Sequence, residues 1–330
     1  MKRFFSIVVS LFMCLAFFAG CNSNNSKIDS DKLESVSVLL DWTPNTNHTG
    51  LIVASKKGFY KDYGLDVEII QANEGGTSQL IGANQGTFGI SYQEEVTFAC
   101  EKDIPVRAIA ALIQHNTSGF ASPKEKNIVT PLDFENKTYG GWGSPVEIAT
   151  LQALTKKYNA DFDSINIATI GAMDFFTATQ KDIDFTWIYY GWDGIAAKNR
   201  NFEINFIDLG KENPNLDFYT PVIIANNVLL SENPEMVKNF LHATQKGYEF
   251  CIENPEEAAT ILLEYAPELD NELVIESQKW LANQYINDAN SWGLMEESRW
   301  DNYTQWLYAN DLLEKKVNSN LMFTNEYLPK

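Results

Sequence analysis

Residues 36–50 read VSVLLDWTPNTNHTG, and this stretch sets the organisation of the whole chain. Its first five residues are mostly apolar and β-branched, which predicts a buried strand over Val36–Leu40. The loop that follows carries a Trp, two Asn and one of only three His in the chain. Thr43–Asn45 would make a turn unaided, because Pro fixes φ and Asn bonds to its own backbone. The remaining polar and aromatic side chains predict that the loop forms one wall of a cleft.

The rest of the chain alternates short β-branched runs with helical patterns. Further strands are expected at 66–70, 88–91, 106–113, 137–139, 165–170 and 183–188, with extended segments at 202–209 and 222–230. Helices are expected at 49–57, at 77–85, from 92 to about 101, at 144–158 and 173–180, and from 233 to about 313. This alternation predicts an α/β fold with mostly parallel sheets.

The length of the chain and the order of its segments predict two lobes. A chain of 330 residues is too long for a minimal domain. The segments 106–125 and 215–226 are expected to cross between the lobes. Lobe 1 then comprises residues 36–122 and 226–330, and lobe 2 comprises residues 123–225. One sheet lobe interrupted by a second, and completed by helices, is the plan of a two-lobed binding protein.

The charge and the motifs exclude several classes of function. The formal net charge of −19 argues against a nucleic-acid partner, because no basic stretch offsets the repulsion from phosphates. Three dispersed His predict no metal site. The sequence contains neither a Gly-x-Ser-x-Gly elbow nor a His-Glu-x-x-His pattern, so we expect no catalytic residues and no cofactor. Cys100 and Cys251 fall in expected helices and are predicted to be buried free thiols.

The first 20 residues have the features of a secretory signal peptide. A basic start is followed by an apolar run and by small residues directly before Cys21. The residues before Cys21 resemble a bacterial lipoprotein box, with Phe18 in place of the usual Leu. We expect a lipid on Cys21 and a tether over residues 21–35, which would anchor an extracytoplasmic body to the bacterial cell membrane. An uncleaved N-terminal membrane anchor is the alternative.

The candidate ligand-binding residues are those that directly follow the expected strands, because ligands of open α/β sheets bind beyond the carboxyl ends of strands. In the first lobe these residues are Trp42, Asn45, His48, Tyr92 and Glu95. In the second lobe they are Trp142, Gly143, Ser144, Tyr189, Tyr190, Trp192 and Asp193. Both sets combine rings with hydrogen-bonding groups, which predicts a polar and aromatic cleft.

Several of these positions also have a purely structural interpretation. His48 could cap the helix that follows it. The runs Ser91–Glu94 and Ser144–Glu147 both match the capping box, in which Ser is followed three residues later by Glu. We therefore expect Glu94 and Glu147 to cap helices rather than to contact a ligand.

Residues 189–193, YYGWD, place three aromatic rings around one Gly beside an acid. Core packing could account for one or two of the rings. Burying all three beside Asp193 would cost desolvation unless the carboxylate had a partner. A flat heteroaromatic ligand explains the whole set, since its ring can stack on Tyr or Trp and an amino group can donate to the carboxylate.

Four stretches of the chain together resemble one protein family. They are LDWTPNTNH at 40–48, KGFYKDYGL at 57–65, FGISYQEE at 88–95 and GGWGSP at 140–145. They are similar to the substrate-binding lipoproteins of ABC importers that are related to fungal thiamine-pyrimidine synthase, and above all to bacterial receptors for a formylated aminopyrimidine. The resemblance covers roughly residues 36–260. It implies a type 2 periplasmic-binding-protein fold, in which two Rossmann-like lobes joined by a two-crossing hinge close on the ligand.

The resemblance also implies a function. It implies a monomeric receptor that delivers a thiamine-related aminopyrimidine, formylaminopyrimidine or hydroxymethylpyrimidine, to an ABC permease. In the fungal enzymes a Lys that carries pyridoxal phosphate and a His that is consumed stand where this chain has Ser91 and Glu95, so the synthase activity does not carry over. A receptor for riboflavin or an alkanesulfonate remains an alternative, as does a pyrimidine-processing enzyme with Glu95 or Asp193 as general base.

Overall fold

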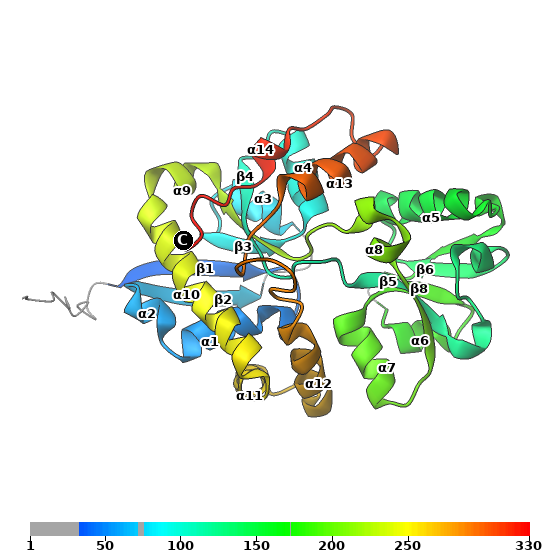
Figure 1. Cartoon of the computed structure of the whole chain (residues 1–330), viewed down its shortest axis with the longest axis horizontal. Helices are drawn as coiled ribbons and strands as arrows, with labels where there is room; N and C mark the ends of the chain where they lie inside the picture. Colours follow the sequence, from blue (N-terminus) through cyan, green and yellow to red (C-terminus); the bar gives the residue numbers. More distant parts are fainter. Residues whose placement is uncertain (1–32, 72–75, 172) are drawn as a thin grey trace, which may run out of the picture.

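The computed structural model describes residues 33–71, 76–171 and 173–330, and it is built around two five-stranded sheets (Figure 1). The first sheet has the strand order β2-β1-β3-β10-β4. Its strands are β1 (Glu34–Leu40), β2 (Leu65–Gln71), β3 (Phe88–Ser91), β4 (Val106–Ala111) and β10 (Val222–Asn226). The expected signal peptide, Cys21 and most of the expected tether lie outside the described residues. The strand β1 starts at Glu34, two residues earlier than expected, because Glu34 already pairs with Leu65.

The second sheet has the strand order β7-β6-β8-β5-β9. Its strands are β5 (Ser118–Pro123), β6 (Thr138–Gly141), β7 (Asn166–Thr169), β8 (Phe185–Tyr189) and β9 (Ile204–Asp208). We call each sheet with the helices around it a lobe. The α/β class is confirmed, and both sheets are mixed: four of the five strands in each run in the same direction. The strand that follows a crossing, β10 or β5, lies next to the edge strand and runs antiparallel to both of its neighbours.

The helices of the first lobe are α1 (Thr49–Lys56), α2 (Phe59–Asp62), α3 (Thr77–Gly82), α4 (Gln93–Glu101), α9 (Asn227–Glu232), α10 (Pro234–Glu253), α11 (Pro255–Tyr265) and α12 (Asn271–Ala282). Those of the second lobe are α5 (Pro145–Tyr158), α6 (Phe175–Thr179), α7 (Ile195–Asn199) and α8 (Leu209–Glu212). They are followed by α13 (Glu297–Ala309) and α14 (Ser319–Met322). The segment 222–230, expected to be extended, turns into α9 because Asn226 ends β10 and caps the helix by accepting from Val228 N–H.

The chain crosses between the sheets twice. It leaves the first sheet after Ala111 and enters the second at Ser118, then leaves the second after Asp208 and returns at Val222. The strand β5 lies inside the segment that the sequence assigns to the first crossing. Its residues, SGFASP, include no β-branched residue and are small apart from Phe120 and Pro123, so local propensity does not identify it.

The cores explain how the lobes are held. The helix α10 packs its apolar face on the first sheet, with the Phe240 ring stacked 3.9 Å from that of Phe88. The helix α13 serves both lobes: Trp300 packs with the first sheet and Tyr303 with the second. Both thiols are free; Cys251 is buried as expected, whereas Cys100 is only half-buried. Over the described ranges, no helix has the length and apolar character needed to span a bilayer.

Candidate ligand site between the two lobes

The loop after β1 is organised around the carboxylate of Asp41. The backbone N–H of Asn45 donates to His48 Nδ1 (3.2 Å), so the ring proton is on Nε2. Nε2 donates in turn to Asp41 Oδ1 (2.7 Å). His48 is fully buried. The structure therefore gives His48 the role of orienting Asp41, and neither of its ring nitrogens remains for a ligand.

The side chain of Asn45 is also engaged within this loop. Its Oδ1 accepts from the backbone N–H of Asn47 (2.9 Å), and its Nδ2 donates to the carbonyl of Thr43 (3.1 Å). These bonds hold the short helical turn Thr46–His48 in place. Asn45, like His48, thus shapes the loop that presents Asp41.

Tyr92 and Glu95 join Asp41 from the end of β3. The Tyr92 hydroxyl donates to Asp41 Oδ2 (2.6 Å), and Ser91 Oγ donates to Glu95 Oε2 (2.9 Å). Burial raises the pKa of Asp41, but its interactions with His48 and Tyr92 outweigh burial, and the pKa lies below its usual value. Burial and the nearby Asp41 instead raise the pKa of Glu95, against the hydrogen bond from Ser91. This edge of the first lobe is acidic and rich in hydrogen-bond acceptors.

Tyr189 brings the second lobe to this edge. It ends β8, and burial raises the pKa of its hydroxyl, as do the surrounding carboxylates of Glu94, Asp41 and Glu95. Burial and neighbouring groups, Tyr189 among them, raise the pKa of the Tyr92 hydroxyl in the same way. Two strand ends that are 97 residues apart by number, at Tyr92 and Tyr189, therefore meet between the lobes. This is the convergence that the sequence predicts for residues after strand ends.

The loop after β6 is held by a buried carboxylate of its own. Ser144 and Glu147 form the expected capping box at the start of α5, which is confirmed. Glu147 also accepts from the backbone N–H groups of Trp142 (3.1 Å), Gly143 (2.8 Å) and Ser144 (2.8 Å), and from the Tyr139 hydroxyl. Gly143 has φ +95°, a backbone conformation that L side chains rarely adopt. The loop N–H groups are thus bound to Glu147, and the loop presents Trp142.

Two tryptophans of the candidate set are exposed. Trp42 is 42% exposed after β1, and Trp142 is 48% exposed after β6. The Trp142 ring meets that of Trp187, in β8, edge to face at 5.4 Å. Both rings are therefore available as stacking surfaces, one from each lobe.

Residues 190–194 form a single π-helical turn that contacts the first lobe directly. The Tyr190 ring lies 5.4 Å from that of Trp280 in α12, and Trp192 packs against the apolar cluster around Ile52 and Val274. Ser277, also in α12, donates to the carbonyl of Gly191. In this turn Tyr190 and Trp192 hold the lobes against each other.

Asp193 belongs to the same turn. Its Oδ2 accepts from the backbone N–H of Tyr189 (3.3 Å). Burial, together with repulsion from Asp174, raises the pKa of Asp193 to about 6, against the backbone hydrogen bonds that lower it. Asp193 thus has a partner, as the cost of burying it requires, but the partner is backbone.

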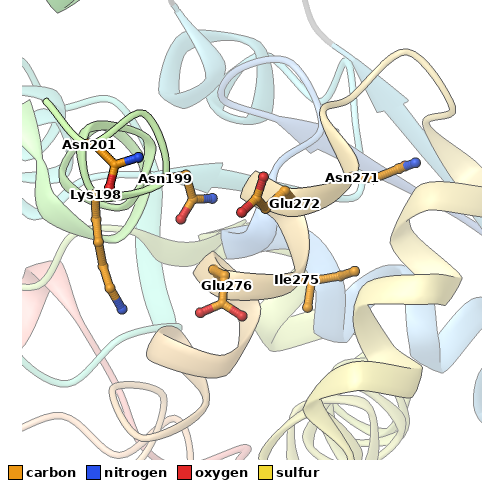
Figure 2. Close-up of a pocket in the computed structure, with 7 residues that line it drawn as sticks. All are labelled: Lys198, Asn199, Asn201, Asn271, Glu272, Ile275 and Glu276. Atoms are coloured by element: carbon orange, nitrogen blue, oxygen red, sulfur yellow. The ribbon is translucent and has the colours of Figure 1, made fainter.

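A cavity of about 600 Å³ opens between α7 and α12, where the lobes face each other (Figure 2). Asn199, Glu272 and Glu276 point into the space between the helices, whereas Asn271 points away (Figure 2). The lining contains no aromatic side chain and none of the residues predicted for the site. It offers a planar ligand no stacking partner, so we place the site at the strand ends instead.

The structure corrects one assignment and adds residues that the sequence did not single out. The expected capping box at Ser91–Glu94 is wrong: Tyr92 precedes the first turn of α4, and Ser91 bonds to Glu95 instead. Glu94 is left beside Tyr189, together with Thr220 and Tyr303. The one local signal for Glu94 is its position two residues beyond a strand end that already carries Tyr92.

Comparisons with known proteins agree with this geometry. The model of the family described as NMT1/THI5 like matches residues 45–258. The formylaminopyrimidine-binding protein of Halalkalibacterium halodurans is 29% identical, covering 94% of this chain and 95% of that protein. The 4-amino-5-hydroxymethyl-2-methylpyrimidine phosphate synthase of Legionella pneumophila is 24% identical, covering 89% and 92%. The crystal structure of the periplasmic aliphatic sulphonate binding protein SsuA from Escherichia coli superposes with a TM-score of 0.70 at 12% identity, covering 90% and 94%.

The chain therefore belongs to the NMT1/THI5-like family, and its fold is that of the periplasmic binding proteins. Both expectations drawn from the sequence, the family and the fold, are confirmed.

Proposed function

We propose that this protein is the extracytoplasmic substrate-binding component of an ABC importer and that it binds a thiamine-related aminopyrimidine between its lobes. Formylaminopyrimidine and hydroxymethylpyrimidine are the two ligands of this class that we favour. Family membership and the periplasmic-binding-protein fold support a role in binding a small molecule. The observation that carries the ligand assignment is the meeting of Tyr189 with the Asp41–Tyr92 pair across the lobes.

The chemistry of that meeting point suits an aminopyrimidine. An exocyclic amino group is a hydrogen-bond donor, and the carboxylates of Asp41 and Glu95 are acceptors with unused lone pairs. A flat ring can stack on Trp42 or Trp142, which contributes roughly 0.5–1.5 kcal/mol beyond area burial for each such pair. Asp193 supplies a third acceptor from the second lobe. Lobe closure would then bring acceptors and rings to the ligand together.

The same site disfavours an anionic ligand such as a sulfonate. Backbone N–H groups at the start of a helix commonly hold anions. Here those of Trp142, Gly143 and Ser144 already donate to Glu147. Asp41, Glu95 and Asp193 would in addition repel a negative charge.

A receptor fits these residues better than a synthase does. Ser91, which stands where the fungal enzymes carry their pyridoxal phosphate lysine, is buried and bonded to Ser78 (2.9 Å) and Glu95. A serine cannot form a Schiff base, so the residues here do not fit that cofactor. The pyrimidine-processing alternative would need Glu95 or Asp193 as a general base. Glu95 does accept from the Ser91 hydroxyl, but Ser91 is fully buried and also bonded to Ser78, and Asp193 accepts from the backbone N–H of Tyr189.

Isothermal calorimetry with aminopyrimidines, flavins and sulfonates tests the ligand assignment. We expect submicromolar binding of a formylated or hydroxymethylated aminopyrimidine, weaker binding of riboflavin and none of an alkanesulfonate. Mass spectrometry of the small molecule that co-purifies with the protein gives an independent identification. A preference for a sulfonate or a flavin would overturn the pyrimidine assignment, and chemical conversion of the bound ligand would overturn the receptor role.

The membrane anchor and the permease are part of the same proposal. The lipoprotein-like residues before Cys21 motivate both, since a lipid on Cys21 would hold the receptor near a permease. Expression in a bacterium followed by detergent phase partition tests this, with the Cys21→Ser variant as the matched control. The wild-type protein should enter the detergent phase and the variant should not; equal partition of the two would refute lipidation.

A further inference from the structure

Three buried polar atoms lie near the Tyr189 hydroxyl; within the described part of the chain two of them lack a hydrogen-bond partner, and the third, Thr220 Oγ1, has at most the Tyr189 hydroxyl as a partner. They are Glu94 Oε2, Thr220 Oγ1 and the Tyr303 hydroxyl oxygen. Tyr303 is 0% exposed and Thr220 is 1% exposed. Buried polar groups are usually hydrogen-bonded, and each exception calls for an explanation.

Several contacts bring the residues that carry these atoms into one region, although they are far apart in sequence. The Gln93 side chain accepts from the backbone N–H of Tyr219 (2.8 Å), and the Gln93 N–H donates to the Tyr219 carbonyl (3.0 Å). Glu94 and Thr220, which follow Gln93 and Tyr219 in the chain, both lie near the Tyr189 hydroxyl, because both change its pKa. Phe98, one helical turn after Glu94, packs in the cluster that contains Tyr303.

Tyr189 links this inner group to the outer edge of the site. The charges of Glu94, Asp41 and Glu95 raise the pKa of its hydroxyl, and the Thr220 side chain lies beside it. Glu94 and Tyr189 in turn raise the pKa of the Tyr303 hydroxyl. One hydroxyl from the second lobe thus lies between the outer acceptors and the inner group, where the ligand is proposed to bind.

We propose that Glu94, Thr220 and Tyr303 form an inner contact for the ligand, and that they bind the polar edge of a planar heterocycle carrying adjacent donor and acceptor atoms. This inference rests on the proposed function and deepens it. The two hydroxyls can each donate or accept. A protonated Glu94 can donate its O–H to a ring nitrogen while its other oxygen accepts from the adjacent amino group.

This contact needs a protonated Glu94, and the surroundings of Glu94 favour the protonated form. Burial raises the pKa of Glu94 to about 8, and repulsion from Glu95 adds to the effect, against a bond from its own backbone. The titratable groups that face Glu94 are Glu95 on its own helix, Tyr189 from the second lobe and Tyr303 from α13. At neutral pH the carboxyl therefore carries its proton and is a donor.

Titration calorimetry of Glu94 variants tests the proposal, with formylaminopyrimidine as the first probe. Glu94→Ala should weaken binding about tenfold or more, the loss that corresponds to one buried hydrogen bond of about 1.4 kcal/mol. Glu94→Gln, which keeps a neutral donor and an acceptor, should stay within about threefold of the wild type at pH 7. Wild-type affinity should fall as the pH rises through about 8, and that of Glu94→Gln should not. Glu232→Ala, at the exposed end of α9, is the control and should change nothing.

The outcomes separate this inference from the proposed function. If the wild type binds formylaminopyrimidine and Glu94→Ala binds it equally well, the inner contact is refuted while the function stands. If the wild type prefers riboflavin or a sulfonate, the same variants are measured with that ligand; a loss there supports the contact and refutes only the pyrimidine. Tyr303→Phe removes one hydroxyl without removing the ring and serves if Glu94→Ala does not fold. Unchanged affinity in Tyr303→Phe would then count against the contact.

Discussion

The two lobes contribute largely different groups to the proposed ligand site, and we call these two sets of groups its walls. The first lobe contributes carboxylates, Asp41, Glu94 and Glu95, held at the ends of β1 and β3. The second lobe contributes rings, Trp142 and Tyr189 among them, at the ends of β6 and β8. The most deeply buried carboxylate of the second wall, Glu147, is used up by its own loop.

This difference suggests a division of labour. The first wall keeps lone pairs available for donors of a ligand, since each of its carboxylates has few protein partners. The second wall uses its polar groups internally, and so presents apolar ring faces and a turn that reaches across to α12. Changes in the first wall should therefore alter selectivity and pH dependence, and changes in the second should alter loop order and closure.

The largest effect is expected from Glu147→Ala, which tests whether the buried carboxylate of the second wall serves to hold its own loop. The change leaves three loop N–H groups and the Tyr139 hydroxyl without their acceptor. We expect the free energy of unfolding to fall by about 3 kcal/mol, since bonds to charged groups contribute roughly 1.5–3 kcal/mol each and water replaces some of them. Urea unfolding measures the loss. Glu147→Gln, which keeps one acceptor, should lose less, and an unchanged stability in Glu147→Ala would break the comparison.

Trp192→Ala should have the next largest effect and should act on binding rather than on folding. Trp192 belongs to the second lobe but packs on the Ile52 and Val274 cluster of the first, so its loss opens the lobe contact without emptying either core. We expect affinity to fall about tenfold, which corresponds to 1.4 kcal/mol, with a melting temperature within a few degrees of the wild type. Calorimetry and small-angle scattering measure both. An unchanged affinity with a large fall in melting temperature would make Trp192 a core residue.

How much of the two walls can be predicted from sequence alone depends on how far apart in sequence the contacting residues lie. The strands β1, β3 and β8 are evident from local patterns, so Tyr92 and Tyr189 were predicted to lie at one edge of the site; Asp41, the first residue after β1, was not among the candidate residues. Glu94 was assigned to a helix cap because Ser91-Tyr-Gln-Glu94 has the spacing of one.

What overrides that local pattern comes from distant parts of the chain. Gln93 pairs with Tyr219, which lies 126 residues further along, and this pairing frees Glu94 for the interior. Thr220 and Tyr303 were missed for the same reason: they come from a crossing and from a helix that has no local link to the site. Patterns within a few residues do not predict such long-range contacts, whereas they are sufficient to predict where a regular strand ends.

Asp193→Asn probes a carboxylate of the second lobe that the proposed site includes. The pKa of Asp193 is about 6 in the folded protein, above its usual value, so the folded state holds its proton more tightly than the unfolded chain. Its contribution to stability is therefore present at low pH and is lost as the pH rises through about 6. At pH 7.5 the Asn variant should be more stable than the wild type by about 1–2 kcal/mol, and at pH 4 the two should be equal.

Thermal or urea unfolding across this pH range checks the result, and ligand affinity gives a second readout. A fall in affinity at pH 7.5 would show that the charge of Asp193 is used for the ligand. An unchanged affinity would remove Asp193 from the site and leave the acceptors to the first wall alone. A stability difference that does not vary with pH would refute the burial argument.

The smallest effect is expected at the hinge, away from both walls, where charges pair with each other. His115, in the first crossing, bonds to Asp217 in the second (2.7 Å) and to Asp288 (3.0 Å). The hydrogen bond to Asp217 raises the pKa of His115 above its usual value, against burial and the nearby Arg299. The stabilisation is therefore complete at low pH and disappears as the pH rises through the folded-state pKa.

His115→Gln should lower the free energy of unfolding by less than about 1 kcal/mol at pH 6, because the pair is partly exposed and screened by solvent. At a pH above the folded-state pKa of His115 the variant and the wild type should be equally stable, since His115 is then neutral in both states. His242→Gln, on α10 beside the Tyr63 ring, replaces an imidazole outside the two crossings and is the control. A His115→Gln difference that persists above that pKa would mean that the ring stabilises the hinge by packing. The charge argument would then apply to the two walls and not to the crossing that joins them.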